Sequence, residues 1–188
     1  MNDTFKKNNI RKTICTASSL ILIIWIVEFI NLFTNHKFVE FGIYPRKLSG
    51  LIGIPFSTFI HGSIWHTVSN TLPLFVLSGF LFVVEKNRFW LITTLIIVFS
   101  GIFVWIFSRN SYHVGASGLV FGYFGAILMH ANIKRNLQSI LISFLTLVLY
   151  GSTLVVGLLP VNQFTSYESH IFGLLTGLGI IYFLKKNI

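Results

Sequence analysis

The chain has 188 residues, of which 54% are hydrophobic and 10% are charged, and its net charge is +9. A soluble domain carries roughly 25% charged residues, so this chain has too little polar surface for a water-soluble globule. Its basic residues flank apolar runs and form no single basic face, so we expect no nucleic-acid partner. Cys15 is the only cysteine, which excludes a disulfide framework or thiolate metal cage within the chain; we expect no cofactor.

Six apolar runs follow one another along the chain, and each approaches the about 20 residues that a helix needs to cross a bilayer. They lack the alternation of barrel strands, and backbone groups in hydrocarbon must be satisfied internally, so helices are predicted. With no repeat or linker, residues 1–188 are predicted to form one domain, an all-α polytopic bundle with a short cytoplasmic tail at about 1–12. The predicted spans are 13–33, 64–84, 88–108, 116–132, 137–157 and 168–185.

A long segment separates the first two spans. It contains the stretch from Phe41 to Arg46 and the stretch from Gly50 to Gly53, and it is too apolar for a solvated linker. Irregular backbone survives at membrane depth only where protein or water satisfies it. We therefore predict a half-inserted loop that packs against the bundle.

Lysine and arginine predict the orientation. Both termini are placed in the cytoplasm by the positive-inside rule, because ten basic residues fall on one side and four on the other. The second, fourth and sixth spans then run inward from the outer side, and their first turns carry His66 with Asn70, Ser117, and His170. The ten are Lys6, Lys7, Arg11, Lys12, Lys86, Arg88, Lys134, Arg135, Lys185 and Lys186; the four are Lys37, Arg46, Lys47 and Arg109.

Ser117 lies in a Gly-Ala-Ser-Gly motif, residues 115–118, at the start of the fourth span. Taken alone, such a motif is more often a stripe of small residues that lets helices approach closely, and Gly122 and Gly125 continue this stripe. A nucleophilic serine also needs a base within hydrogen-bond reach. The sequence must therefore supply that base from another helix.

His170 is the candidate base. It shares one helix face with Gly173 and Gly177, because spacings of three and four residues align side chains. These glycines are expected to let the sixth span lie tightly against the fourth, close enough for an imidazole nitrogen to come within about 3 Å of Ser117 Oγ. Glu168 lies about 200° around the helix from His170, so it cannot orient that ring, and we predict a Ser–His dyad.

Three further side chains have two open interpretations each. His66 and Asn70 share a face of the second span, either as donors to a developing oxyanion beside the Ser117 amide or as an interhelical hydrogen bond that pins the loop. Phe121, one turn below Ser117, either stacks on the imidazole or is a core- or lipid-facing aromatic. The remaining histidines are predicted to be structural or interfacial: His61, which ties down the loop, and His36, His113 and His130.

Rival membrane chemistries are tested by what they require. An aspartyl protease needs two intramembrane aspartates, and Asp3 is the only aspartate. A zinc protease needs a His-Glu-x-x-His motif, which is missing. A haem site on facing histidines stays open, although it leaves Asn70 and the Gly-Ala-Ser-Gly motif without a role. A transporter is expected to show inverted repeats, and the sequence shows none.

These motifs together resemble the rhomboid family of intramembrane serine proteases, over a region from about Phe41 to Gly177. His61-Gly62-Ser63 followed by His66 and Asn70 is similar to the second-helix signature of the family. Gly115-Ala116-Ser117-Gly118 is similar to its nucleophile motif, and His170 with Gly173 and Gly177 to its last catalytic helix. The tryptophan–arginine pair in the first loop of some relatives is absent as such, and Pro45-Arg46 lies in that region.

The resemblance implies a six-helix core with Ser117 as nucleophile, His170 as base and acid, and His66, Asn70 and the Ser117 amide as the oxyanion site. It implies single-span transmembrane proteins as substrates, with small residues at the cut. We expect a bacterial cytoplasmic membrane, an active site that opens to the outer side under a cap formed by residues 158–167, and the fifth span as a side gate. The alternative is a non-catalytic polytopic protein: a rhomboid-like binder or chaperone, a haem protein or a small transporter.

Overall fold

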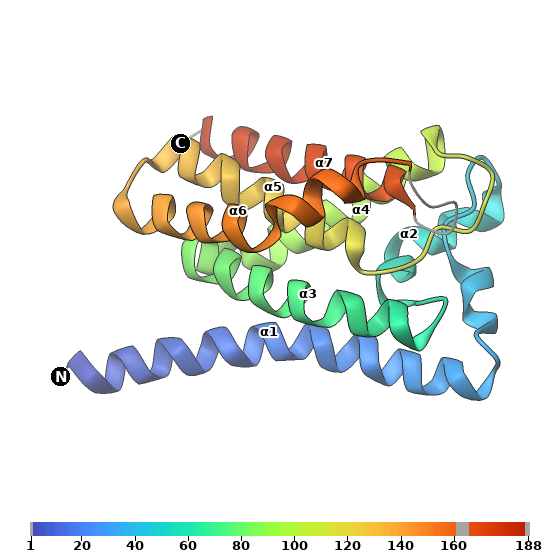
Figure 1. Ribbon diagram of the computed structural model, residues 1–188, viewed down its shortest axis with the longest axis horizontal. Helices are drawn as coiled ribbons and strands as arrows, with labels where there is room; N and C mark the ends of the chain where they lie inside the picture. Colours follow the sequence, from blue (N-terminus) through green and yellow to red (C-terminus); the bar gives the residue numbers. More distant parts are fainter. Residues whose placement is uncertain (1, 161–165, 187–188) are drawn as a thin grey trace.

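The computed structural model describes residues 2–160 and 166–186, and within these the protein is all-α. Its long helices lie side by side in one bundle (Figure 1). Each predicted apolar run overlaps one of them, although α1 begins well before the predicted start at residue 13, and the all-α class is confirmed. The long helices are α1 (Asn2–Phe33), α3 (Ile64–Glu85), α4 (Phe89–Phe107), α5 (Ser117–Lys134), α6 (Leu137–Gly157) and α7 (Tyr167–Lys186).

The predicted loop between the first two spans consists of short helical turns: η1 (Lys37–Phe41), η2 (Leu48–Ile52), α2 (Gly53–Phe56) and η3 (Ser57–Phe59). It is fastened to the end of α4. Arg46 donates hydrogen bonds to the Ile106 carbonyl at 3.0 Å and to Asn110 Oδ1 at 2.5 Å, and Trp105 Nε1 donates to the Lys47 carbonyl at 2.9 Å. Arg46 therefore anchors the loop, whereas its half-insertion into a bilayer stays a prediction.

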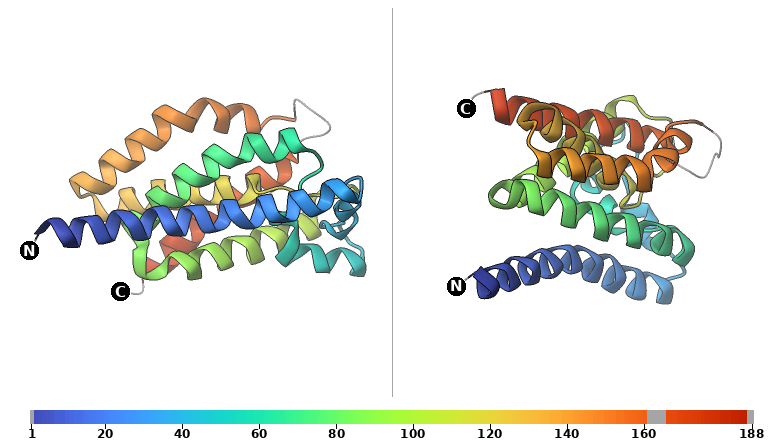
Figure 2. Two further views of the ribbon diagram at one scale, coloured as in Figure 1. Left: turned by 90° about the horizontal axis from the view of Figure 1, so that it is seen from below. Right: turned by 60° about the vertical axis from the view of Figure 1, so that its left-hand side comes forward.

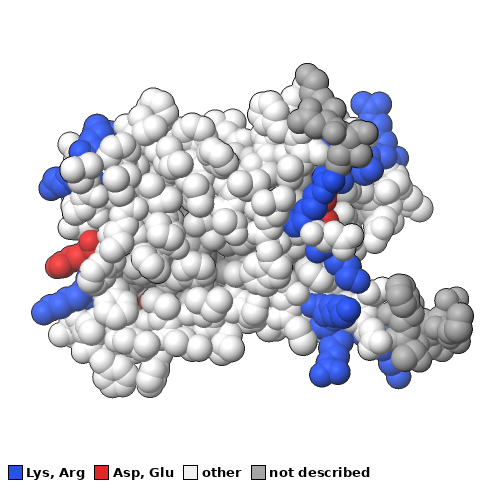
Figure 3. All heavy atoms as spheres, turned by 180° about the vertical axis from the view of Figure 1, so that it is seen from behind, with Lys and Arg blue, Asp and Glu red and all other residues white. Residues whose placement is uncertain are grey.

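The surface of the molecule is that of an integral membrane protein. Three helical stretches, 7–33, 64–107 and 167–185, are long and apolar enough to cross a membrane, and the second comprises α3, the short turn η4 (Lys86–Arg88) and α4. Lysines and arginines gather at the two ends of the molecule, and the face between them is almost free of charge (Figure 3). This banding is expected for a protein whose middle lies in hydrocarbon.

Helix α5 forms the centre of the bundle, and it contacts α3, α4, α6 and α7. Helix α1 instead lies at the edge, against α3 (Figure 2). The α5–α7 interface is a backbone-to-backbone contact: a Cβ at Gly173 would collide with the Gly118 carbonyl, and a Cβ at Gly177 would collide with the Gly122 carbonyl. Glycine is therefore required at both α7 positions for the helices to come this close.

Near their C-terminal ends, α3, α5 and α7 are joined by hydrogen bonds between polar side chains. Glu85 Oε1 accepts hydrogen bonds from His130 Nδ1 at 2.6 Å and from Lys185 Nζ at 3.0 Å. Glu85 and His130 are both buried. His130, predicted to be a packing or interfacial residue, thus belongs to a hydrogen-bonded cluster that joins three helices.

Candidate active site

Ser117 is the first residue of α5, and the turn before it is held from two directions. Gly115 has a φ of +116°, a conformation that side-chain-bearing residues rarely adopt, and its N–H donates to the Ser57 carbonyl at 2.9 Å. The Ala116 N–H donates to His61 Nε2 at 3.3 Å. The Ser117 N–H belongs to the first turn, where amides have no intrahelical acceptor, so it is available to a bound group.

The imidazole of His170 is fixed in one tautomer. Its Nδ1 lies 2.7 Å from the Gly157 carbonyl at the end of α6. Because a carbonyl only accepts, Nδ1 carries the proton and Nε2 of the neutral ring carries a lone pair. The ring also stacks on Phe121, with centroids 4.3 Å apart and an interplanar angle of 1°. The stacking interpretation of Phe121 therefore agrees with the structure.

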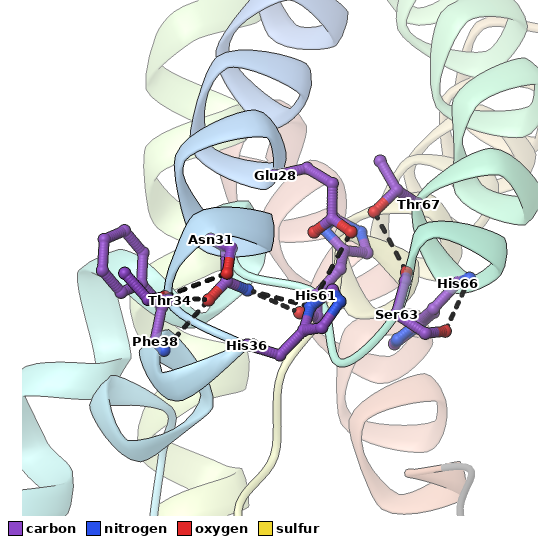
Figure 4. Close-up of polar contacts among 9 residues, drawn as sticks. All are labelled: Glu28, Asn31, Thr34, His36, Phe38, His61, Ser63, His66 and Thr67. Carbon is purple, nitrogen blue, oxygen red and sulfur yellow. Dashed lines mark hydrogen bonds and ion pairs between the residues drawn. The ribbon is translucent and has the colours of Figure 1, made fainter.

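His66 and Asn70 occupy the first turns of α3. Ser63 caps this helix, because its hydroxyl oxygen accepts the His66 N–H at 3.2 Å, as Figure 4 shows. The His66 ring lies against the turn of residues 115–117, where a Cβ at Gly115 would be 2.7 Å from its Nε2. One amide N–H of Asn70 donates to the His66 carbonyl at 2.9 Å, which leaves the second N–H for another acceptor.

A cavity of about 810 Å³ brings the predicted residues together. Ser117, His170, His66, Asn70 and Phe121 all contribute to its wall. Within the described part of the chain, no hydrogen bond joins Ser117 Oγ to His170. Catalytic hydrogen bonds are often long in unliganded sites and tighten only when substrate binds. The arrangement brings a serine hydroxyl, two imidazole rings and a side-chain amide around one space.

His61 supports this wall from behind. It is fully buried, and burial lowers its pKa to about 3, so the ring is neutral and its Nε2 can accept the Ala116 amide. Its carbonyl accepts a hydrogen bond from Asn31 Nδ2 of α1 at 3.0 Å (Figure 4), and its ring packs edge-on against His66 with centroids 5.0 Å apart. His61 thus contacts both the turn of residues 115–117 and the His66 ring.

Two further features were not found from the sequence. The Gly157 carbonyl, which orients His170, is a backbone group and has no signature in the sequence. Glu168, which was excluded as the orienting group, has its Oε1 3.5 Å from Arg109 Nε.

Most of the predicted cap, residues 161–165, lies outside the described residues. Among the residues that the structure describes, no group of three or more His, Cys, Asp or Glu is arranged to hold a metal ion.

The sequence of this chain matches the model of a known protein family. The model of the Rhomboid domain matches residues 48–187, which is most of the chain. The protein belongs to the rhomboid family. This confirms the resemblance seen in the sequence, and it places the cavity wall formed by α3, α5 and α7 within the rhomboid domain.

The relatives of this rhomboid-family chain include bacterial and viral proteins. An uncharacterized protein of Mycobacterium leprae is 30% identical over 179 residues, which cover 90% of this chain and 70% of the relative. An uncharacterized protein of Mycobacterium tuberculosis is 29% identical over 179 residues, which cover 90% of this chain and 74% of the relative. A protein of Acanthamoeba polyphaga mimivirus that is named as a rhomboid protein is 29% identical over 142 residues, covering 69% of this chain and 72% of the relative.

Proposed function

We propose that this protein is an intramembrane serine endopeptidase that uses Ser117 and His170 as a catalytic dyad. The observation that carries the proposal is the fixed tautomer of His170. Its Nδ1–H is held by the Gly157 carbonyl, so the unprotonated Nε2 is a base, and both this ring and Ser117 line one cavity. A hydroxyl nucleophile requires such a base beside it.

The reaction follows from these groups. His170 Nε2 takes the proton of Ser117 as Oγ attacks the scissile carbonyl, and the Ser117 amide, Asn70 and His66 donate to the oxyanion. His170 then gives its proton to the leaving amine as the peptide bond breaks. Water enters, His170 takes a proton from it, and the hydroxide attacks the ester that joins Ser117 Oγ to the acyl group. The C–Oγ bond then breaks, His170 returns its proton to Ser117 Oγ, and the acid product leaves. The ring of Phe121 keeps the imidazole in place throughout.

The substrates of this reaction are proposed to be single-span transmembrane proteins. The cavity continues from the dyad to Leu77 of α3 and to Tyr150 and Thr153 of α6, so a peptide can reach Ser117 from the side between these two helices. Peptide bonds in a helix are hydrogen-bonded and shielded, so the substrate must unwind locally. Small residues at the cut and helix-weakening residues nearby meet this requirement.

The proposal includes a location. Six spans with both termini in the cytoplasm place the starts of α3, α5 and α7, and therefore the cavity, toward the outer side of the membrane. The bacterial relatives support a bacterial cytoplasmic membrane as the site of action. Water then reaches the dyad from the extracytoplasmic side.

A fluorophosphonate probe tests the proposal, because it labels an activated serine. We expect the wild type to be labelled and to cut a model transmembrane substrate, and Ser117→Ala to remain folded but to do neither. Ser69→Ala is the matched control, since Ser69 also lines the cavity, and it should be labelled like the wild type. Equal labelling or cleavage by Ser117→Ala would rule out Ser117 as nucleophile and favour a non-catalytic rhomboid-like binder.

A further inference from the structure

His113 lies four positions before Ser117, outside the dyad and the oxyanion site, and its backbone is fixed to the loop that follows α1. The His113 N–H donates to the Ile43 carbonyl at 2.9 Å, and the Ile43 N–H donates to the His113 carbonyl at 3.1 Å. The residue is 2% exposed. Its ring is therefore presented from a rigid position, and the partners of its two nitrogens decide what it can do.

The two ring nitrogens of His113 have different roles. Burial lowers the pKa of His113, so the ring is neutral and one nitrogen donates while the other accepts. Nε2 lies 3.0 Å from the Arg109 carbonyl, which only accepts, so Nε2 carries the proton. Nδ1 lies 2.5 Å from Ser166 Oγ and therefore accepts the hydroxyl proton of Ser166.

Ser166 is the cap of the helix that carries the candidate base. It directly precedes Tyr167, the first residue of α7. Its Oγ accepts the Ser169 N–H at 3.4 Å and lies 2.6 Å from Ser169 Oγ, and its carbonyl accepts the His170 N–H at 3.4 Å. This is N-cap geometry, in which a side-chain oxygen satisfies a first-turn amide. Because the hydroxyl proton goes to His113, the oxygen lone pairs stay directed at α7.

The same segment holds the first turn of α7 at a second point. Arg109, whose carbonyl orients the His113 ring, also approaches Glu168, with the Arg109 N–H and Nε each 3.5 Å from Glu168 Oε1. An acidic residue in a first helical turn is itself favourable beside the helix dipole. Residues 109–113 therefore hold the start of α7 by hydrogen bonds, and the residues that follow them, 114–116, lead to Ser117.

We propose that His113 is a positioning residue that fixes the start of α7 through Ser166 and thereby holds His170 in register with Ser117. The proposal rests on the proposed function for its catalytic consequence, whereas the cap itself does not depend on it. His113 lines the same cavity as Ser117 and His170, but its ring nitrogens bond to Ser166 and Arg109 and to neither of these residues. It joins the segment that carries the nucleophile to the helix that carries the base.

The test is a double-mutant cycle on the full chain in detergent micelles or nanodiscs. His113→Phe keeps a ring without hydrogen-bonding nitrogens, and Ser166→Ala removes the capping hydroxyl. We expect each single variant to speed hydrogen exchange at the Ser169 and His170 amides by about five- to ten-fold, the size expected for one lost helix cap. We expect each to slow fluorophosphonate labelling of Ser117 by a similar factor, and the double variant to be no worse than the more affected single variant.

Two controls separate positioning from general damage. His113→Gln, whose amide can both donate and accept, should restore most of the labelling rate, and Ser111→Ala, which removes only the weaker 3.4 Å contact to His113 Nε2, should match the wild type. Additive effects in the cycle, or unchanged exchange at Ser169 and His170, would overturn the proposal. Exchange that responds as expected in a protein whose Ser117 is never labelled would support the cap and refute the proposed protease function instead.

Discussion

The α5–α7 contact and the α3–α6 side of the bundle are built in opposite ways. Between α5 and α7, glycines bring backbone against backbone, and a single Cβ at Gly173 or Gly177 would collide with a carbonyl of α5. Between α3 and α6, side chains such as Leu77 and Tyr150 border the cavity. The proposed dyad is thus divided across a close backbone contact, while peptide is proposed to arrive between helices whose side chains border a cavity.

One interface thus serves to fix the geometry of the proposed catalytic groups, and the other serves to admit the substrate. A nucleophile and base must stay within a fraction of an ångström of productive geometry, which a backbone contact enforces better than flexible side chains. A path for a substrate helix needs the reverse, a surface that can yield. The two sides should therefore respond differently to substitution, and the following four predictions test this from the largest expected effect to the smallest.

Gly173→Leu should abolish cleavage and lower the free energy of unfolding by about 3 kcal/mol or more, because overpacking a closed interface cannot relax. Gly179→Leu is the matched control on the same helix, since a Cβ there meets nothing within 4 Å, and it should stay folded and active. Thermal unfolding in detergent measures the stability of each variant, and cleavage of a model transmembrane substrate measures its activity. Similar behaviour of the two variants would show that the α5–α7 contact is not tight in the membrane.

Asn70→Ala, on the cavity side, should lower kcat by about 10²-fold with little change in KM or in thermal stability, because it removes an oxyanion donor. Steady-state cleavage of the same substrate separates the two constants. A rise in KM at constant kcat would instead assign Asn70 to substrate docking.

Phe121→Leu should lower kcat by about five-fold, since an aromatic pair contributes about 0.5–1.5 kcal/mol beyond its buried area. Phe121→Tyr keeps the ring and should stay within about two-fold of the wild type. If the leucine variant were as active as the tyrosine variant, the parallel stacking on His170 would have no part in turnover.

Tyr150→Ala should raise kcat/KM for a transmembrane substrate by about two- to five-fold, because loss of a ring between α3 and α6 eases lateral access. The fluorophosphonate, which is small, should react with Ser117 at an unchanged rate. A lower kcat/KM for the transmembrane substrate would argue against α6 as the gate.

Most of the fold could be predicted from the sequence because each apolar run is long and is bounded by basic or turn residues. The helices α3, α4 and α6 begin and end within a residue or so of the predicted spans, whereas α1 begins at Asn2, well before the predicted start at residue 13. The short turns of residues 37–59 could not be foreseen, because their hydrogen bonds go to distant groups such as the Ile106 carbonyl. The number of membrane crossings stays a prediction.

The candidate site was foreseen where a side chain alone carries the signal. Ser117, His170, His66 and Asn70 are predicted by residue type and by position in the first two turns of a span, and the structure places all four on one cavity. The Gly157 carbonyl and the His113–Ser166 pair were missed, because their roles depend on segments that meet only in the folded chain. The catalytic roles themselves stay predictions.

The acceptor for His170 Nδ1 is the carbonyl of Gly157, the last residue of α6. The helix proposed to swing aside for a substrate is therefore also the one that sets the protonation pattern of the base. If this end of α6 moves outward to admit a substrate, the contact between His170 Nδ1 and the Gly157 carbonyl must lengthen, and it re-forms when α6 returns. Such a linkage would keep Ser117 unreactive while the gap between α3 and α6 is open, and would activate it only after the peptide has entered the cavity.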